Sequence, residues 1–402
     1  MPVNARLTQR ISPARRVAFD VLESVAGGGY ASDALRERSA KLERRDAGLA
    51  SQIVFGCLRY QQQLDYLIFR YSGRKAEGLD LAVSIALRSA IFQLRYLERI
   101  PAHAAVDEAV ELVKQHKRAA VGLTNAVLRK VNRDPVKWPD LQTELSCPAW
   151  MLRRWGQHFG ADAARGIARV ALAEPETYIR VRPGSAPPEG MTVEATEVAG
   201  CFRLLSPGIL VPGRSGMRLH DISSQAIVPL LDLRPGQTYL DLCAAPGNKT
   251  LQALEIPLGL AVACDVSPKR IREIPDVCPR VVLDATCPLP FRRRFDRIFV
   301  DAPCSGTGTL GRNPEIKWRV QEQDFARLGI KQLATLGEAL RLLAPGGKLV
   351  YATCSLEREE NEEVIREALL AWPQFRCEGE MWRVPGREAG DGFYAATWRA
   401  LA

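Results

Sequence analysis

The chain of 402 residues is long enough for two or three domains, each with its own hydrophobic core, and its 47% apolar and 25% charged residues are ordinary for a soluble protein. No apolar run approaches the roughly 18 residues that a membrane helix needs, and the ten cysteines include no CxxC pair, which argues against a zinc site or a disulfide framework. We therefore expect a metal-free protein of a reducing compartment, the cytoplasm, with no membrane partner.

The net charge of +9 is concentrated at the N-terminal end of the chain. Residues 1–135 contain 22 Lys and Arg against 14 Asp and Glu, whereas the remainder contains 33 against 32. Such an asymmetry favours a polyanion such as RNA as the partner of the first third. A well-solvated basic helical surface is the alternative.

The first third has a helical pattern from Pro13 to about Val131. Apolar residues recur at helical spacing, for example at Val17, Val21 and Val25, which predicts an all-α bundle over residues 1–139. Within it, Ile100–Lys114 and Gly122–Arg129 resemble the NusB-type RNA-binding helical domain. That resemblance implies RNA binding without catalysis.

A small α+β subdomain is expected over residues 140–216. Asp134–Pro139 contains two prolines and reads as a linker, a helix begins near Pro148, and short strands are expected around 178–182 and 202–205. Four of its side chains, Trp150, Trp155, Arg180 and Arg182, are candidates to stack on or pair with RNA. For the two tryptophans, core packing is the alternative.

From residue 217 to 402 strands and helices alternate, which predicts a doubly wound, Rossmann-like α/β domain. The strand candidates are Tyr239–Cys243, Leu260–Cys264, Arg280–Leu283, Arg297–Asp301 and Lys348–Thr353. Long helices are expected at 322–343 and 358–371, and residues 393–399 read as a closing strand at an edge. Ligands of such sheets bind outside the carboxyl ends of the strands.

A small-residue loop follows the first of these strands and leads into a helix. Its residues are Cys243, Ala244, Ala245, Pro246, Gly247, Asn248 and Lys249. Such a turn lets a nucleotide-like ligand approach the backbone closely. Asp265 ends the next strand, where an acid can hold ribose hydroxyls, and Asp284 ends the third, in reach of an adenine. Capping a helix or facing water is the alternative role of these acids.

Two cysteines at later strand ends suggest a covalent catalyst. Cys304 lies in Asp301-Ala-Pro-Cys-Ser-Gly-Thr-Gly, and Cys354 lies in Tyr351-Ala-Thr-Cys-Ser. A thiol in each loop and the Asp301 carboxylate are the groups that nucleophilic and acid–base catalysis use. The alternative for either cysteine is a buried small apolar residue.

Together these motifs resemble the RsmB/Nop family of S-adenosylmethionine-dependent RNA cytosine-C5 methyltransferases. The resemblance implies that Cys354 attacks the base, Cys304 assists product release and Asp301 contacts both cofactor and base. It implies that S-adenosylmethionine binds at 243–249, Asp265, Asp284 and Asp301, with Lys249 orienting the cytosine. It also implies a substrate-facing loop around Arg312–Trp318.

The RsmB branch of the family implies small-subunit (16S) ribosomal RNA as the substrate, and we expect a monomer. The alternatives are a DNA cytosine-C5 methyltransferase and a non-catalytic RNA-binding or antitermination-type factor. Two departures from the family pattern stand out. The first is Asn248, which replaces a second glycine; because asparagine tolerates positive φ better than most residues, we expect the turn to be kept. The second is the short segment between Asp265 and Asp284, in which only a very short crossover helix fits.

Overall fold

The computed structural model describes residues 11–182, 184–187, 190–206 and 217–400. The chain divides into two compact units, one of Met1–Ala173 with Gly311–Arg319 and one of Glu174–Leu310 with Val320–Ala402. The expected division at residues 139/140 and 216/217 stays a prediction, because compactness does not test where a domain begins. Among the described residues, no helix is both long and apolar enough to cross a membrane.

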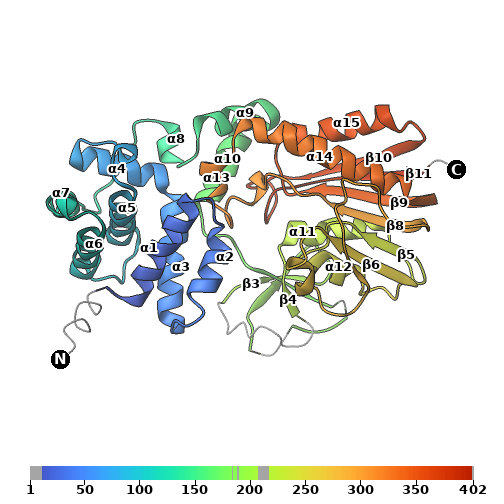
Figure 1. The fold of residues 1–402 in the computed structure, drawn as a ribbon, viewed down its shortest axis with the longest axis horizontal. Helices are drawn as coiled ribbons and strands as arrows, with labels where there is room; N and C mark the ends of the chain where they lie inside the picture. The colour runs from blue at the N-terminus through green and yellow to red at the C-terminus, as the bar shows by residue number, and fades with distance from the viewer. Residues whose placement is uncertain (1–10, 183, 188–189, 207–216, 401–402) are drawn as a thin grey trace. The chain divides into compact units, whose positions relative to one another are not determined.

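The first unit is helical (Figure 1). Its main helices are α1 (Pro13–Ala26), α2 (Ala31–Arg38), α3 (Arg44–Arg59), α4 (Gln61–Ser72), α5 (Leu81–Tyr96), α6 (Ala102–His116), α7 (Val121–Leu128), α8 (Leu141–Glu144), α9 (Ala149–Phe159) and α10 (Ala161–Leu172). The expected all-α bundle is therefore confirmed.

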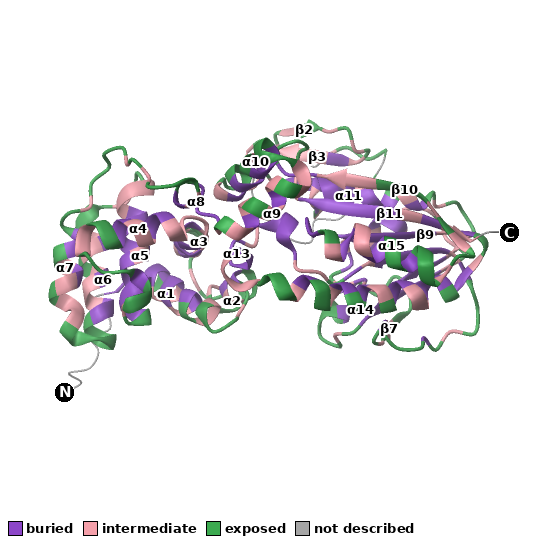
Figure 2. Cartoon of the chain, turned by 90° about the horizontal axis from the view of Figure 1, so that it is seen from above, coloured by how far each residue is buried: buried purple, intermediate pink, exposed green. Residues whose placement is uncertain are grey.

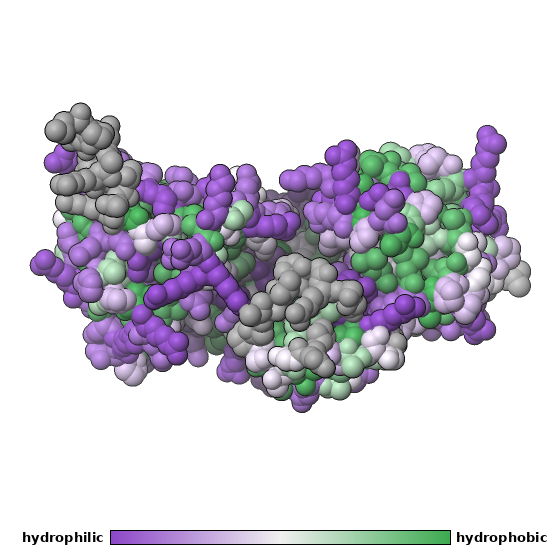
Figure 3. All heavy atoms as spheres, turned by 90° about the horizontal axis from the view of Figure 1, so that it is seen from below, coloured by the Kyte–Doolittle hydropathy of each residue, from purple (hydrophilic) through white to green (hydrophobic). Residues whose placement is uncertain are grey.

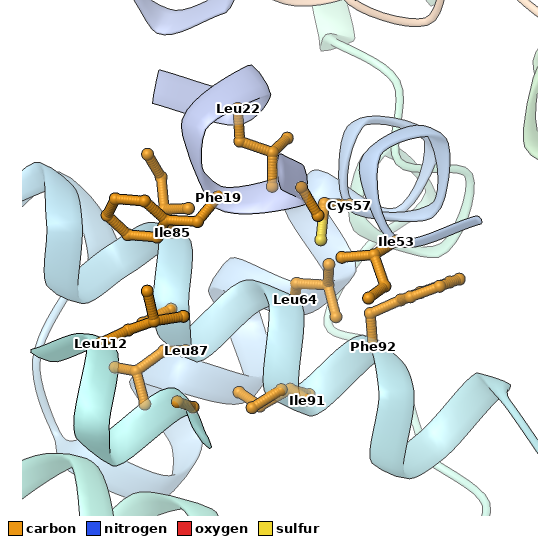
Figure 4. Close-up of a cluster of buried hydrophobic side chains, with 14 of the residues drawn as sticks. Phe19, Leu22, Ile53, Cys57, Leu64, Ile85, Leu87, Ile91, Phe92 and Leu112 are labelled. Carbon is orange, nitrogen blue, oxygen red and sulfur yellow. The ribbon is translucent and has the colours of Figure 1, made fainter. Parts of the chain in front are cut away.

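Helix α5 is the centre of the bundle. It begins at Asp80, whose side chain accepts a hydrogen bond from the N–H of Ala82 and so caps the first turn. Apolar residues on more than one of its faces are buried, because α1, α3, α4, α6 and α7 all pack around it. Figure 4 shows Phe19, Ile53, Leu64 and Leu112 from four of these helices meeting around α5.

One short piece of the C-terminal half of the sequence belongs to this unit. Helix α13 (Ile316–Arg319) brings Glu315 and Lys317 into it, each only 2% exposed, and Trp318 packs against the same core. The Lys317 ammonium donates hydrogen bonds to the carbonyl oxygens of Arg59 and Ser146, at 3.0 and 2.8 Å. The expected substrate-facing loop at 312–318 is therefore wrong for these three side chains, because each packs and hydrogen-bonds inside the helical unit, although the Oε2 atom of Glu315 has no hydrogen-bond partner among the described residues.

The second unit contains two sheets. The smaller sheet is antiparallel, with the order β2-β3-β1-β4. Its strands are β1 (Tyr178–Val181), β2 (Val193–Ala195), β3 (Cys201–Leu204) and β4 (Met217–Leu219). Strands β1 and β3 are the two expected from the sequence. Strands β2 and β4 have only three residues each, too few for alternation to reveal.

The larger sheet has seven strands in the order β10-β11-β9-β8-β5-β6-β7. They are β5 (Thr238–Asp241), β6 (Leu260–Asp265), β7 (Arg280–Val282), β8 (Phe295–Asp301), β9 (Leu343–Thr353), β10 (Phe375–Arg383) and β11 (Phe393–Ala400). Strands β5 to β9 run parallel to one another, while β11 runs antiparallel to β9 and β10. The expected edge position of the last strand is wrong: β11 lies between β9 and β10, and β10 forms the edge.

Helices cover both faces of this sheet (Figure 1). Helices α14 (Glu322–Arg341) and α15 (Glu362–Ala371) pack on the face that carries Ile298 and Leu349. On the other face, α11 (Ile222–Ile227), α12 (Asn248–Ala253) and the 3₁₀ turn Val228–Leu231 pack against residues such as Phe299 and Val350. Adjacent residues of one strand point to opposite faces, so a near-continuous apolar run serves both layers. Figure 2 shows the strands largely buried between these helices.

The connection from β6 to β7 contains only a 3₁₀ turn, Arg270–Glu273. Three prolines at 268, 275 and 279 prevent a longer helix from forming there. The expected very short crossover is therefore what the structure contains. The Rossmann-like class is confirmed by the helix-covered parallel core of the sheet.

Candidate active site

The small-residue loop 243–249 connects β5 to α12 at the carboxyl edge of the sheet. Gly247 has φ = +107°, a left-handed conformation that favours glycine, and a Cβ there would lie 3.0 Å from the Ile274 side chain. Asn248 and Lys249 then begin α12. Gly247 is thus required both by the left-handed turn and by its packing against Ile274, and the loop ends at the N-terminal end of a helix.

Asn248 does not need the conformation that the sequence suggested. The left-handed residue is Gly247, and Asn248 is already helical. Its side-chain amide instead donates a hydrogen bond to the carbonyl oxygen of Leu219 at 3.0 Å. The expectation that Asn248 must tolerate positive φ is therefore wrong, and its side chain ties the loop to strand β4.

The buried carboxyl group of Asp241 joins the strand before the loop to the helix after it. Asp241 is 1% exposed and accepts hydrogen bonds from the hydroxyls of Tyr239 and Thr250, at 3.2 and 2.7 Å. Burial raises the pKa of Asp241 to about 7. Its Oδ1 atom has no hydrogen-bond partner among the described residues. Asp241 stands at the start of the motif, but the sequence does not show that its carboxyl group bonds to neighbouring side chains inside the protein.

Asp265 and Asp284 follow β6 and β7 at the same edge. The Asp265 carboxylate accepts hydrogen bonds from the N–H groups of Ala245 and Ser267, at 3.1 and 2.9 Å, and is 6% exposed. Asp284 is exposed and accepts from the backbone N–H and hydroxyl of Thr286, which lower its pKa. The loop fixes Asp265 directly, whereas Asp284 is held only by its own turn.

The two cysteines lie side by side. Cys304 follows β8, Cys354 follows β9, and these strands are parallel neighbours, so their carboxyl ends meet. The two sulfur atoms are 3.3 Å apart. The hydrogen bond with Cys354 and burial raise the pKa of the Cys304 thiol well above its ordinary value. The raised pKa favours the protonated form of the Cys304 thiol, which can then donate a hydrogen bond to the Cys354 sulfur.

Lys249 connects the loop to the cysteines. Its ammonium lies 2.6 Å from a carboxylate oxygen of Asp301 and 5.0 Å from the centre of the Phe393 ring. Burial alone would lower the pKa of Lys249, but the Asp301 carboxylate and the negative charge of a Cys354 thiolate raise it. Lys249 therefore stays cationic beside Asp301 and Cys354.

Glu360 is the residue at this site that the sequence reasoning missed. It is fully buried, and its carboxylate accepts hydrogen bonds from the backbone N–H of Ser305 at 2.8 Å, the hydroxyl of Ser355 at 2.7 Å and the amide of Gln332 at 3.0 Å. The Ser305 hydroxyl donates a further bond at 2.5 Å. Burial raises the pKa of Glu360, and these hydrogen bonds partly offset the rise. Glu360 lies in the acidic run after Cys354, but acidic runs usually face solvent, so the sequence carried no usable signal.

Two candidates for RNA contact are not available for it. Arg180 is 5% exposed, and its guanidinium makes a paired contact with the Glu255 carboxylate at 2.8 and 2.5 Å. Trp155 is 1% exposed in the helical unit, so its packing alternative is the correct one. Arg180 failed as a candidate because a sequence does not reveal which arginines have a carboxylate partner.

Comparison with known proteins adds to this geometry. A family model described as 16S rRNA methyltransferase RsmB/F matches residues 228–399, and the NusB family model matches residues 12–133. A probable ribosomal RNA small subunit methyltransferase B of Bacillus subtilis is 32% identical over 373 residues, covering 84% of this chain and 83% of its own length. The chain belongs to the RsmB/F methyltransferase family.

Two further likenesses extend over nearly the whole of this RsmB/F family member. The ribosomal RNA small subunit methyltransferase B of Klebsiella pneumoniae is 31% identical over 421 residues, which cover 95% of this chain and 97% of the relative. The solved structure of PH0851 has a TM-score of 0.79 and 25% identity, covering 97% of this chain and 99% of the other. This family member is an RNA methyltransferase, and S-adenosylmethionine is its cofactor.

Proposed function

We propose that this enzyme methylates C5 of a cytidine in small-subunit ribosomal RNA through a transient covalent bond to a cysteine. The observation that carries this proposal is the 3.3 Å separation of the Cys304 and Cys354 sulfur atoms at the carboxyl edge of the sheet. The names of the Bacillus and Klebsiella relatives support ribosomal RNA as the substrate.

The chemistry of the target explains the need for a thiol. C5 of cytosine is too weak a nucleophile to take a methyl group unaided. Addition of a thiolate at C6, with protonation at N3, converts the ring into an enamine whose C5 is nucleophilic. After methylation, C5 must lose its proton before the sulfur–C6 bond can break.

The residues divide these steps between them. The Cys354 thiolate adds to C6, and Asp301, held by Lys249 at 2.6 Å, relays a proton from solvent to N3. In the adduct the Cys354 sulfur no longer carries negative charge, so the contribution of Cys354 to the raised pKa of Cys304 is removed, while that of burial remains. Cys304 then loses its proton to solvent and accepts the proton from C5. Elimination breaks the sulfur–C6 bond, the proton on N3 returns to solvent through Asp301, and Cys354 becomes a thiolate again beside a protonated Cys304.

The cofactor fits the residues of the loop. S-adenosylmethionine, when bound, supplies a methyl sulfonium group. The loop turns at Gly247 into the N-terminal end of α12, and Asp265 is oriented by two backbone N–H groups while each of its oxygens keeps a free lone pair. We assign cofactor binding to residues 243–249 with Asp265, Asp284 and Asp301.

Covalent trapping tests the assignment of the two thiols. We expect Cys304→Ala to accumulate an enzyme–RNA adduct that survives a denaturing gel, because attack proceeds while release fails. Cys354→Ala should form none, and neither should the double variant. An adduct in Cys354→Ala that is lost in Cys304→Ala would reverse the two roles, and would match the alternative in which a DNA-type enzyme attacks from its Pro-Cys loop. The absence of any adduct and any methylation would support the non-catalytic RNA-binding factor.

The helical unit supports the proposal through its charge. Hydrophilic side chains predominate on the face of this unit seen in Figure 3. Lys41, Arg44 and Arg45 at the start of α3 are exposed and make no hydrogen bond or ion pair with any described residue. We propose that these side chains contact RNA phosphates.

Substitution of the three residues by alanine tests this contact. Removing about three phosphate contacts should lower the slope of log affinity against log salt by about 2. Deleting residues 1–135 is a poorer test, because it would remove the groups that satisfy Glu315, Lys317 and Trp318. An unchanged slope in the triple variant would place the RNA surface elsewhere.

A further inference from the structure

A second basic feature lies in the C-terminal unit, whose sequence is otherwise nearly balanced in charge. Arg292, Arg293 and Arg294 are consecutive and all exposed. None of them makes a hydrogen bond or an ion pair within the part of the chain that the structure describes. Three adjacent guanidinium groups with no ion pair form a local positive charge that is open to an anion, although Arg293 also acts at longer range on the Asp296 carboxylate, whose pKa it helps to lower.

The run is held in place at both ends. Phe291 packs against the core of the large sheet, and Phe295 begins β8 and is fully buried. Their rings meet edge to face with centres 5.6 Å apart. The three arginines are therefore displayed on a short segment whose flanks are anchored, which lowers the entropy lost when they bind a partner.

A groove of about 730 Å³ adjoins this run. Arg294, Arg341, Trp372 and Phe375 are among the residues that line it. The Trp372 ring lies directly on α14, where Gly337 has no side chain: a Cβ at Gly337 would be 2.4 Å from the ring. Aromatic walls beside arginines are the combination that holds unstacked bases and their phosphates.

The groove lies at the edge of the sheet opposite to the cysteines. Phe295, Leu343 and Phe375 are the first residues of β8, β9 and β10, which run in the same direction, whereas Cys304 and Cys354 follow the far ends of β8 and β9. A ligand in this groove is therefore separate from the base that is methylated.

We propose that Arg292–Arg294 and the groove beside them bind a single-stranded segment of the RNA substrate away from the methylated cytidine. This inference rests on RNA being the substrate. RNA is favoured over an acidic protein segment because the groove combines cations with aromatic walls. Of the two arginines that line it, only Arg341 has a carboxylate partner, Glu338 at 2.8 Å.

The test uses the full chain with Arg292, Arg293 and Arg294 all changed to alanine. Loss of about three phosphate contacts should lower the salt slope for a long ribosomal RNA fragment by about 2. If the variant and the parent bind equally at about 1 M salt, the variant then binds roughly 100-fold more weakly than the parent at about 0.1 M salt. Arg366→Ala removes an exposed arginine of the same unit that is paired with Glu367, and should leave the slope unchanged.

Further measurements separate this inference from the proposed function. In a Cys304→Ala background, the triple variant should still form the covalent adduct with a short RNA hairpin that contains the target cytidine. Ultraviolet cross-linking of the long RNA should label the peptide around Trp372 in the parent protein and lose that label in the triple variant. A parental salt slope in the triple variant, or a loss of binding to an acidic ribosomal protein in place of RNA, would overturn the inference. If the adduct forms neither in Cys304→Ala alone nor in Cys304→Ala with the three arginines changed, the proposed function is overturned instead.

Discussion

The Glu360 carboxylate accepts a hydrogen bond from the backbone N–H of Ser305 at 2.8 Å, although 55 positions separate the two residues in the chain. Ser305 follows Cys304, and Glu360 also accepts from Ser355, which follows Cys354. One buried carboxylate therefore fixes the loops of both cysteines. The contact exists because β8 and β9 are parallel neighbours whose carboxyl ends meet.

We predict that Glu360→Gln slows methylation by about 100-fold, since a shift of about 1 Å between reacting groups has an effect of that size. The amide can no longer accept all four hydrogen bonds, so the two loops lose their common anchor. The free energy of unfolding should also fall by about 1.5–3 kcal/mol, the usual contribution of a bond to a charged group. Single-turnover methylation and urea unfolding measure the two effects. Glu363→Gln, a partly exposed residue of α15, is the control; a parental rate in Glu360→Gln would contradict the positioning role.

Lys249→Met should lower the methylation rate tenfold or more, because Asp301 loses its charged partner at 2.6 Å and is no longer oriented. Adduct formation in the Cys304→Ala background should slow by a similar factor, since Lys249 acts before the methyl group is transferred. Lys269→Met changes an exposed lysine of the same unit and should have no effect. Equal rates for the two lysine variants would show that the Lys249–Asp301 pair is only structural.

Lys317 should make the stability of the protein depend on pH in the alkaline range. Burial lowers the pKa of Lys317 from 10.5 to about 8, and Arg59 contributes in the same direction. The unfolded chain therefore binds more protons between pH 8 and 10.5, so this residue's contribution to stability rises with pH through that window and is least favourable below it. We expect the free energy of unfolding of the parent protein, relative to Lys317→Met, to increase by up to about 3 kcal/mol across the window.

Urea unfolding at several pH values between 7.5 and 10.5 measures this difference. Using the difference between the two proteins removes the contributions of the other titrating groups. Lys41→Met, which changes an exposed lysine of the same unit, is the control. A difference that stays constant with pH would show that Lys317 is accessible to water.

Asn248→Gly should weaken binding of S-adenosylhomocysteine by a few-fold, although glycine is the residue expected in the family pattern. The substitution removes the hydrogen bond to the Leu219 carbonyl oxygen and adds freedom at the first residue of α12. Isothermal titration calorimetry measures the affinity. Tighter binding in the glycine variant would show that the Leu219 contact strains the loop.

Much of the architecture was predictable because it depends on local patterns. Helical periodicity identified the bundle, and the apolar runs at 239–243, 260–264 and 297–301 identified three of the parallel strands with their ligand-binding edge. The position of β11 was mispredicted, because strand order depends on pairing between distant segments and not on the pattern within a strand.

The sequence by itself determined which chemical groups this enzyme has at its strand ends: two thiols, a set of carboxylates and a glycine-containing loop. Only the tertiary structure decided which of them meet. It brought Cys304 within 3.3 Å of Cys354, joined Lys249 to Asp301 and buried Glu360, Arg180 and Lys317 against their partners. The physical reason is that residue type sets what a side chain can bond to, whereas strand order and packing set which partner is within reach and how much water is excluded.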